Sequence, residues 1–248
     1  MAEQRSTVDP AEVERFARLA EEWWDPAGKF KPLHRFNPTR LGFIRDRMAA
    51  RFGRDIAGTS PFGGLSLVDI GCGGGLVAEP MARLGFSVTG LDAVTQTIHT
   101  AEAHAAQAGL SIDYRATTAE ALHAEGRRFD VVLALEVVEH VADLPAFLAT
   151  AAGLVAPGGA LIVSTINRTA KAFALAIIGA EYVLGWVPRG THTWSKFVRP
   201  SELVAGLAPH GLAIEELTGT AYHPLTDSWH LAPRDLDVNY MLLATRPA

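Results

Sequence analysis

Between residues 65 and 167 the sequence alternates apolar runs typical of strands with segments typical of helices. The run FDVVLALE at 129–136 is almost wholly apolar, as expected of a parallel strand buried on both faces. Repeated strand–helix units predict an α/β fold with a doubly wound, mostly parallel sheet. Residues 212–223 and 238–247 are later strand-like stretches without a helix between them, so we expect them to pair as an antiparallel edge.

The sequence VDIGCGGG at residues 68–75 follows the first of these strands and precedes a helix. Glycines let the main chain turn tightly there and let a ligand approach it closely. Asp92 ends the next strand, 21 residues after Gly71, where a carboxylate can accept hydrogen bonds from both hydroxyls of a ribose. Gly71, Gly73 and Asp92 are therefore predicted to bind a nucleoside-containing cofactor.

Two cofactors suit this pattern, a dinucleotide and S-adenosylmethionine. The dinucleotide fingerprint is G-x-G-x-x-G, whereas Leu76 here occupies the position of the last glycine. Asp69, two residues before Gly71, would repel a pyrophosphate but suits a ligand that carries ammonium and sulfonium charges. The pattern favours S-adenosylmethionine, and an NAD-dependent oxidoreductase is the disfavoured alternative.

The glycine loop, Asp92 and the Pro-Gly-Gly turn at 157–159 resemble those of class I S-adenosylmethionine-dependent methyltransferases. Over about residues 8–242 the chain resembles, more narrowly, the O-methyltransferases of ubiquinone biosynthesis. That narrower resemblance is carried by residues 23–40, 136–141, 167–200 and 237–242. It implies that Arg40 lies near the cofactor carboxylate, and that Leu135, where the family usually has methionine, lines the adenosine site.

Glu136, Glu139 and His140 follow the fourth strand, at the sheet edge where α/β proteins bind ligands. If a helical turn begins there, the three side chains share one face and can hold a divalent cation such as magnesium, manganese, calcium or zinc. Such a cation would lower the pKa of a phenolic oxygen. Alternatively, His140 acts as the general base without a metal, or the three residues have a structural role. The resembled family includes metal-dependent members.

The chain of 248 residues suits a single methyltransferase domain. Asp9-Pro10 and Asn37-Pro38 are helix-start signals that predict an N-terminal helical cap, its first helix extending to about Trp24. We expect a Rossmann-like, seven-stranded sheet with a helical insert after strand five. The predicted parts are the cap at 1–55, the cofactor-binding core at 65–167, the insert at 168–199 and the C-terminal part of the sheet at 200–248.

The net charge and the cysteine content indicate which partners and which cellular compartment to expect. A net charge of −5 gives no reason to expect a nucleic-acid partner. The first residues lack the apolar core of a secretory signal, and the single cysteine, Cys72, cannot form an internal disulfide. We therefore expect the protein in a reducing cytoplasm.

The insert at 168–199 is unusual because it combines an apolar run with five basic residues and one acid, Glu181. Tyr182, Trp186 and Trp194 are of the types enriched at membrane interfaces. We expect it to bind anionic lipids, so that the protein associates peripherally with the inner face of the membrane. A buried helix or a dimer contact is the alternative.

The resemblance implies an enzyme that transfers the methyl group of S-adenosylmethionine to ring hydroxyls of a polyprenyl catechol and of demethylubiquinol. It also implies other ubiquinone-biosynthesis proteins as candidate partners. A methyltransferase acting on another small molecule is the first alternative, and a non-catalytic membrane scaffold is a further one.

Overall fold

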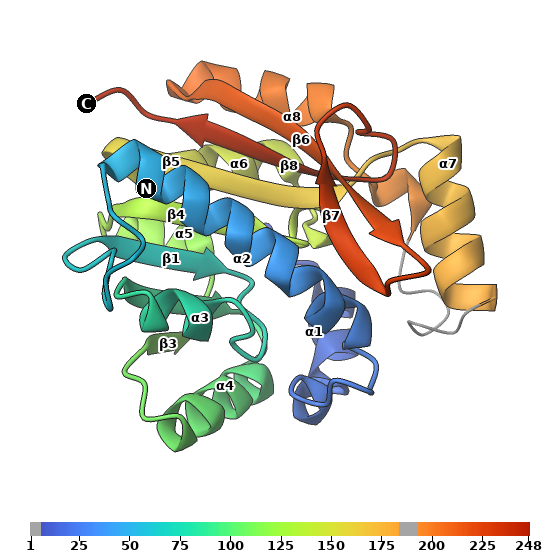
Figure 1. The fold of residues 1–248 in the computed structure, drawn as a ribbon, viewed down its shortest axis with the longest axis horizontal. Coiled ribbons are helices and arrows are strands. Elements are labelled where there is room, and N and C mark those ends of the chain that lie inside the picture. Colours follow the sequence, from blue (N-terminus) through green and yellow to red (C-terminus); the bar gives the residue numbers. More distant parts are fainter. Residues whose placement is uncertain (1–5, 184–192) are drawn as a thin grey trace.

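A computed structural model describes residues 6–183 and 193–248 (Figure 1). Within these residues one sheet has eight strands in the order β3-β2-β1-β4-β5-β8-β6-β7. The strands are β1 (Ser66–Ile70), β2 (Ser87–Asp92), β3 (Asp113–Ala116), β4 (Phe129–Leu135), β5 (Val155–Ile166), β6 (Ala213–His223), β7 (Ser228–Ala232) and β8 (Asn239–Thr245).

The predicted doubly wound sheet with an antiparallel edge is confirmed. Strands β1 to β5 are parallel, while β8 runs antiparallel between β5 and β6. The sheet has one strand more than the predicted seven, because β7 folds back on β6 and pairs Tyr222 with Trp229. The order of the strands reverses between β1 and β4, which places the switch point of the fold there.

Helices cover both faces of the sheet (Figure 1). One buried apolar cluster joins the sheet to α5, α6 and α8, and a second joins its other face to α2, α3 and α4. These helices are α2 (Lys31–Phe52), α3 (Ala78–Arg83), α4 (Thr95–Gln107), α5 (Ala119–Ala124), α6 (Leu144–Gly153) and α8 (Pro200–Leu207). Strand β4 is buried along nearly its whole length between the two clusters, which explains its continuous apolar run.

The N-terminal cap contains α1 (Pro10–Ala17), the 3₁₀ turn η1 (Ala20–Glu22) and α2. Asp9 caps α1 as predicted, its side chain accepting a 3.0 Å hydrogen bond from the Ala11 amide. The first helix ends earlier than expected. The second begins at Lys31 rather than at Asn37-Pro38, because Pro32 already supplies a proline in the first turn, where no amide donor is needed.

Strand β5 is followed by helical residues, as predicted: α7 (Ala170–Ala172), the π-helical segment η3 (Phe173–Val183) and, later, the 3₁₀ turn η4 (Trp194–Lys196). Trp186 and Arg189 of the predicted insert lie outside the described residues, and Glu181 and Tyr182 are described by their backbone alone. Within the part of the chain that the structure describes, no helix is long and apolar enough to cross a membrane.

Candidate active site

A cavity of about 1040 Å³ opens at the carboxyl ends of the parallel strands. The glycine loop and the ends of β2 and β4 form one side, and α1 and the beginning of α2 cover it. The cavity continues past the end of β5 to η3 and to the hairpin between β6 and β7. It therefore has room for both a nucleoside cofactor and a second ligand.

The structure brings the predicted glycine loop and Asp92 together. Gly71 and Gly73 have φ of 71° and 54°, which favours glycine at both positions. The Gly73 amide donates a 3.1 Å hydrogen bond to Asp92 Oδ2, and the Val94 amide donates a 2.8 Å bond to Asp92 Oδ1. The carboxylate thus fixes the loop while both oxygens retain unused lone pairs for a ligand.

Two tryptophans from the cap lie on the glycine loop. A Cβ added to Gly73 would come within 2.4 Å of the Trp23 ring, so the ring rests directly against the loop. Trp24 Nε1 donates a 2.8 Å hydrogen bond to the Gly74 carbonyl oxygen, and its ring stacks on His104 at 3.4 Å. The cap therefore closes the cofactor side of the cavity.

Arg40 and Asp69 are ionisable residues, yet both are nearly fully buried, each with 3% of its surface exposed. Burial lowers the pKa of Arg40, whereas nearby acids, Glu136 foremost, raise it. Burial raises the pKa of Asp69 to about 7, a shift that the charge of Arg40 opposes. Burial likewise raises the pKa of Asp92 to about 6, although its bonds from the Val94 and Gly73 amides act in the opposite direction.

These groups fit the charges of S-adenosylmethionine. Arg40 Nη2 donates to Asn37 Oδ1, but its Nε has no hydrogen-bond partner among the described residues and is buried beside the cavity. A buried guanidinium donor without a partner suits a ligand carboxylate, and the buried carboxylate of Asp69 suits an ammonium group. Leu135, 7% exposed at the end of β4, also lines the cavity.

Glu136, Glu139 and His140 lie at the end of β4 but do not converge. Glu136 has φ of 53°, in the left-handed region, and residues 138–140 form the 3₁₀ turn η2 (Val138–His140). The expectation of a helical turn that begins at Glu136 is therefore wrong, and the three side chains do not share a face. Among the described residues, no group of three His, Cys, Asp or Glu side chains is placed to hold a metal ion.

Each of the three side chains has a different partner. Glu136 Oε1 accepts a hydrogen bond from Ser164 and is 3.9 Å from Arg40 Nη1. Glu139 Oε2 accepts a 2.8 Å bond from Thr165 Oγ1, and burial together with the charge of Glu136 raises the pKa of Glu139. These side-chain positions do not fit a metal bound by all three residues.

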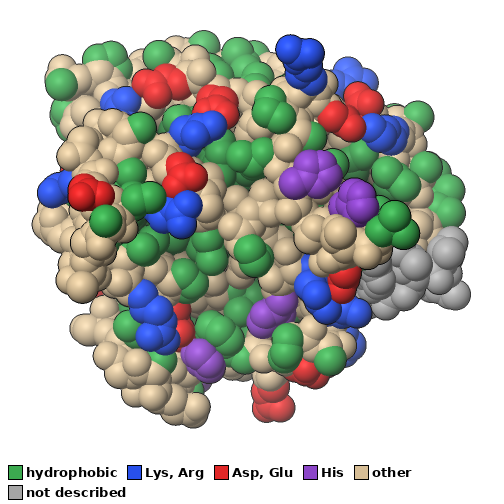
Figure 2. All heavy atoms as spheres, in the orientation of Figure 1, with side chains coloured by type: hydrophobic (Ala, Val, Ile, Leu, Met, Phe, Trp, Pro, Cys, Tyr) green, Lys and Arg blue, Asp and Glu red, His purple; other side chains and the backbone are tan. Residues whose placement is uncertain are grey.

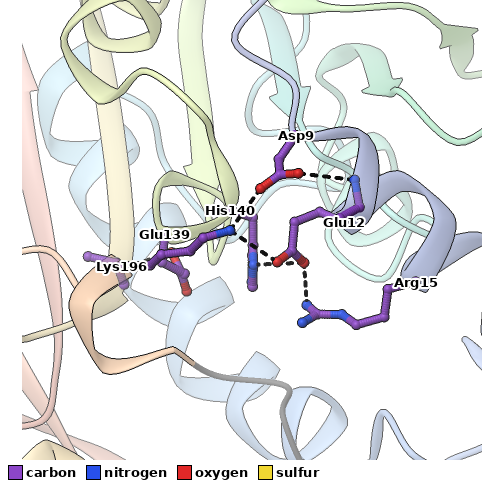
Figure 3. A network of polar contacts seen from close by, with 8 residues as sticks. Asp9, Glu12, Arg15, Glu139, His140 and Lys196 are labelled. Atoms are coloured by element: carbon purple, nitrogen blue, oxygen red, sulfur yellow. Dashed lines mark hydrogen bonds and ion pairs between the residues drawn. The ribbon is translucent and has the colours of Figure 1, made fainter.

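His140 instead contacts an acid from the N-terminal helix, which the sequence did not indicate. Its Nδ1 lies 3.3 Å from Glu12 Oε2. Figure 3 shows the two side chains facing each other. Burial alone would raise the pKa of Glu12, but His140, Arg15 and Lys196 outweigh it and lower that pKa. Lys196 Nζ also lies 2.8 Å from Asp9 Oδ2.

Backbone contacts hold the N-terminal segment that leads into α1 in this position. Val8 forms an antiparallel bridge with Val141, and the Ala142 amide donates a 2.7 Å hydrogen bond to the Thr7 carbonyl oxygen. The Thr7 hydroxyl also donates to Glu120 at the start of α5. No motif signals this arrangement, because the partners lie far apart in the sequence.

The fold and this site define an S-adenosylmethionine-dependent methyltransferase, and comparisons with known proteins agree. A family model described as a methyltransferase domain matches residues 33–217. Magnesium protoporphyrin IX methyltransferase from Synechocystis, solved with bound S-adenosylhomocysteine, shares the fold with a TM-score of 0.61 and 18% identity over 96% of this chain and 94% of that one.

Curated relatives show to which family of methyltransferases the chain belongs. The ubiquinone biosynthesis O-methyltransferase of Parvibaculum lavamentivorans is 60% identical over 98% of this chain and 95% of its own length. The protein of the same name from Brucella anthropi is 60% identical over 98% of both chains. The chain belongs to the ubiquinone biosynthesis O-methyltransferase family, which confirms the resemblance seen in the sequence.

Proposed function

We propose that this protein methylates ring hydroxyls of ubiquinone precursors, a polyprenyl catechol and demethylubiquinol, with S-adenosylmethionine as methyl donor. The observation that carries the proposal is the cavity in which Arg40, Asp69 and Asp92 surround the glycine loop and which continues to His140. Identity of 60% to curated relatives over nearly the whole chain supports the substrate class.

In this proposal Arg40 binds the cofactor carboxylate and Asp69 its ammonium group, while Gly71 and Gly73 allow the main chain to approach. Asp92 accepts hydrogen bonds from the ribose, and Leu135 contacts the adenosine. When bound, S-adenosylmethionine supplies an electrophilic methyl group on a sulfonium. The contribution of the protein is to place the acceptor oxygen in line with that group and to remove its proton.

His140 is the proposed general base that takes the phenolic proton. A phenol has a pKa near 10, so a positioned base speeds the transfer at neutral pH. Glu12 supports this role because its carboxylate lies beside Nδ1, which leaves Nε2 as the nitrogen that can accept the proton. The nearby Phe16 ring, with its centroid 5.5 Å from that of the imidazole, restricts the ring further.

The metal-dependent alternative is tested separately, since Glu136, Glu139 and His140 do not fit a shared ion in their present positions. We expect turnover to persist after exhaustive chelation and to be lost in His140→Ala. Loss of turnover in chelator, with recovery on addition of magnesium, would favour the metal instead.

Two titrations test the class of enzyme. S-adenosylhomocysteine should bind and NAD should not, which separates a methyltransferase from an oxidoreductase. Methylation of a short-tailed catechol should then separate this enzyme from a non-catalytic scaffold or from a methyltransferase with an unrelated substrate. Binding of S-adenosylhomocysteine without methylation of any catechol would refute the proposed substrate class.

The same substrate class favours a peripheral membrane location for a cytoplasmic enzyme, because a polyprenyl tail keeps the acceptor in the bilayer. Phe173, Leu175, Ile178 and Trp194 of the insert are 42–54% exposed, which suits contact with lipid. Charge contributes less than the sequence suggested, since Lys171 pairs with Asp235 at 2.8 Å, Arg168 with Glu202 and Lys196 with Asp9.

Flotation with vesicles tests this location. The protein should float with anionic vesicles and less with neutral ones, and Leu175→Glu with Ile178→Glu should reduce flotation while leaving binding of S-adenosylhomocysteine intact. Unchanged flotation of that double variant would refute docking through these residues. In Figure 2 acidic and basic side chains are interspersed on the visible face.

We also propose that the whole chain acts as one domain. The cap covers the cavity through α1 and α2, and β8 from the C-terminal part pairs with β5 of the core. A single cooperative unfolding transition, seen equally by circular dichroism and by tryptophan fluorescence, would support it.

A further inference from the structure

The cavity has an aromatic wall, formed by residues of α2, β6 and β7, that no sequence motif indicated. Phe36 at the beginning of α2 lies 4.8 Å from Trp229 of β7, measured between ring centroids. Tyr222 of β6 lies 5.6 Å from the same Trp229 ring. All three residues line the cavity, so a flat ring entering it would meet aromatic surfaces.

Polar contacts hold this wall in place. Thr39 Oγ1 donates a 2.8 Å hydrogen bond to the Trp229 carbonyl oxygen, which ties β7 to α2. The Tyr222 hydroxyl donates a 2.8 Å bond to Asp227 in the hairpin turn. These rings are therefore positioned before any ligand arrives.

Thr220 presents one buried hydroxyl to this part of the cavity. It precedes Tyr222 by two residues on β6, so both side chains point to the same face of the sheet. Thr220 is 4% exposed, lines the cavity, and its Oγ1 has no hydrogen-bond partner among the described residues. Buried hydroxyls are normally paired, so a missing partner at a cavity wall points to a group supplied by a ligand.

The aromatic wall also adjoins the cofactor side. The Arg40 guanidinium lies over the Phe36 ring at 4.9 Å from its centroid, and Arg40 Nη1 is 3.9 Å from Glu136 Oε1. A ring placed against Phe36 would thus lie next to the end of β4, from which His140 also comes. This juxtaposition suits an acceptor ring that must reach both the methyl donor and the base.

We propose that Thr220, with Phe36, Tyr222 and Trp229, forms the subsite for the aromatic ring of the methyl acceptor, and that the Thr220 hydroxyl hydrogen-bonds a ring oxygen other than the one methylated. This inference rests on the proposed function, since it specifies how the acceptor of that reaction is recognised. A hydroxyl can donate to or accept from a phenol and can donate to a methoxy oxygen, so the subsite selects for an oxygenated ring. A site built to bond such an oxygen disfavours the analogue that lacks it.

The test compares two pairs of soluble rings in the presence of S-adenosylhomocysteine: catechol with phenol, and 3-methoxycatechol with 3-ethylcatechol, in which a methylene replaces the ether oxygen. Dissociation constants are measured for the wild type, for Thr220→Val, which is similar in shape but has no hydroxyl, and for Thr220→Ser, which keeps it. In at least one pair the wild type should bind the ring with the additional oxygen more tightly than its partner. Thr220→Val should reduce that preference by about 2- to 13-fold, the value of one neutral hydrogen bond, and Thr220→Ser should retain most of it.

The outcomes separate the subsite from the proposed function. If both preferences are unchanged in Thr220→Val while the wild type methylates catechols, the hydroxyl is satisfied by water alone and the subsite is wrong, whereas the function stands. If the wild type binds S-adenosylhomocysteine but neither binds nor methylates any of these rings, both are wrong. Equal affinity for S-adenosylhomocysteine in all three proteins shows that the variants are folded.

Discussion

Replacing Asp92 by asparagine tests the proposed cofactor site, because the change keeps the shape of the side chain and removes its charge. The carboxylate accepts bonds from Gly73 and Val94 at 3.1 and 2.8 Å, one on each oxygen. An amide has one oxygen, so its NH₂ group would face one of these two amide donors. The substitution therefore affects both the ribose and the loop.

The two effects have different sizes and different observables. Loss of charge-assisted hydrogen bonds to the ribose should cost about 1.5–3 kcal/mol, or about 10- to 150-fold in affinity for S-adenosylhomocysteine. The backbone donor left facing an NH₂ group should lower the free energy of unfolding by about 1–3 kcal/mol, or about 2–4 °C in Tm for each kcal/mol.

Isothermal titration with S-adenosylhomocysteine measures the first effect and calorimetric unfolding the second. Asp113→Asn is the matched control, since Asp113 lies at the start of β3, is exposed and bonds Arg115. The control should change neither quantity appreciably. If folded Asp92→Asn protein bound S-adenosylhomocysteine as tightly as the wild type, the ribose assignment would be refuted.

Three further results are expected. Because burial raises the pKa of Asp69 to about 7, its ionised form gains population as pH rises, so affinity for S-adenosylhomocysteine should increase at least about 10-fold from pH 6 to pH 8. Asp69→Asn should lose most of this increase and keep about 2-fold, since burial raises the pKa of Asp92 to about 6; a flat wild-type profile would contradict the role of Asp69. Glu12→Gln should misplace His140 and so lower kcat by up to about 100-fold while cofactor affinity stays constant; an unchanged kcat would count against a positioning role for Glu12. Gly73→Ala should reduce stability by at least about 1–2 kcal/mol, since its φ is 54° and the new Cβ would come within 2.4 Å of Trp23; an unchanged Tm would show that the ring moves freely.

Local features of the sequence were enough to predict the fold class and the proximity of the glycine loop to Asp92. Strand–helix alternation and the buried character of β4 are set by short-range patterns of apolar residues. The glycine loop needs positive φ at Gly71 and Gly73, a requirement that glycine alone signals well. Asp92 was placed correctly beside the loop because parallel neighbouring strands bring their carboxyl ends together.

The tertiary structure decided what depends on contacts between distant segments. Sequence alone suggested a helical turn that would gather Glu136, Glu139 and His140. Glu136 is instead left-handed and accepts a bond from Ser164, and the turn begins only at Val138. Glu12 reaches His140 through the docking of a helix from the other end of the chain, and Thr220 becomes a cavity hydroxyl because β7 folds back over β6. Such contacts follow from the packing of whole elements, which no short stretch of sequence encodes, so the Glu12–His140 contact and the position of Thr220 at the cavity became visible only in three dimensions.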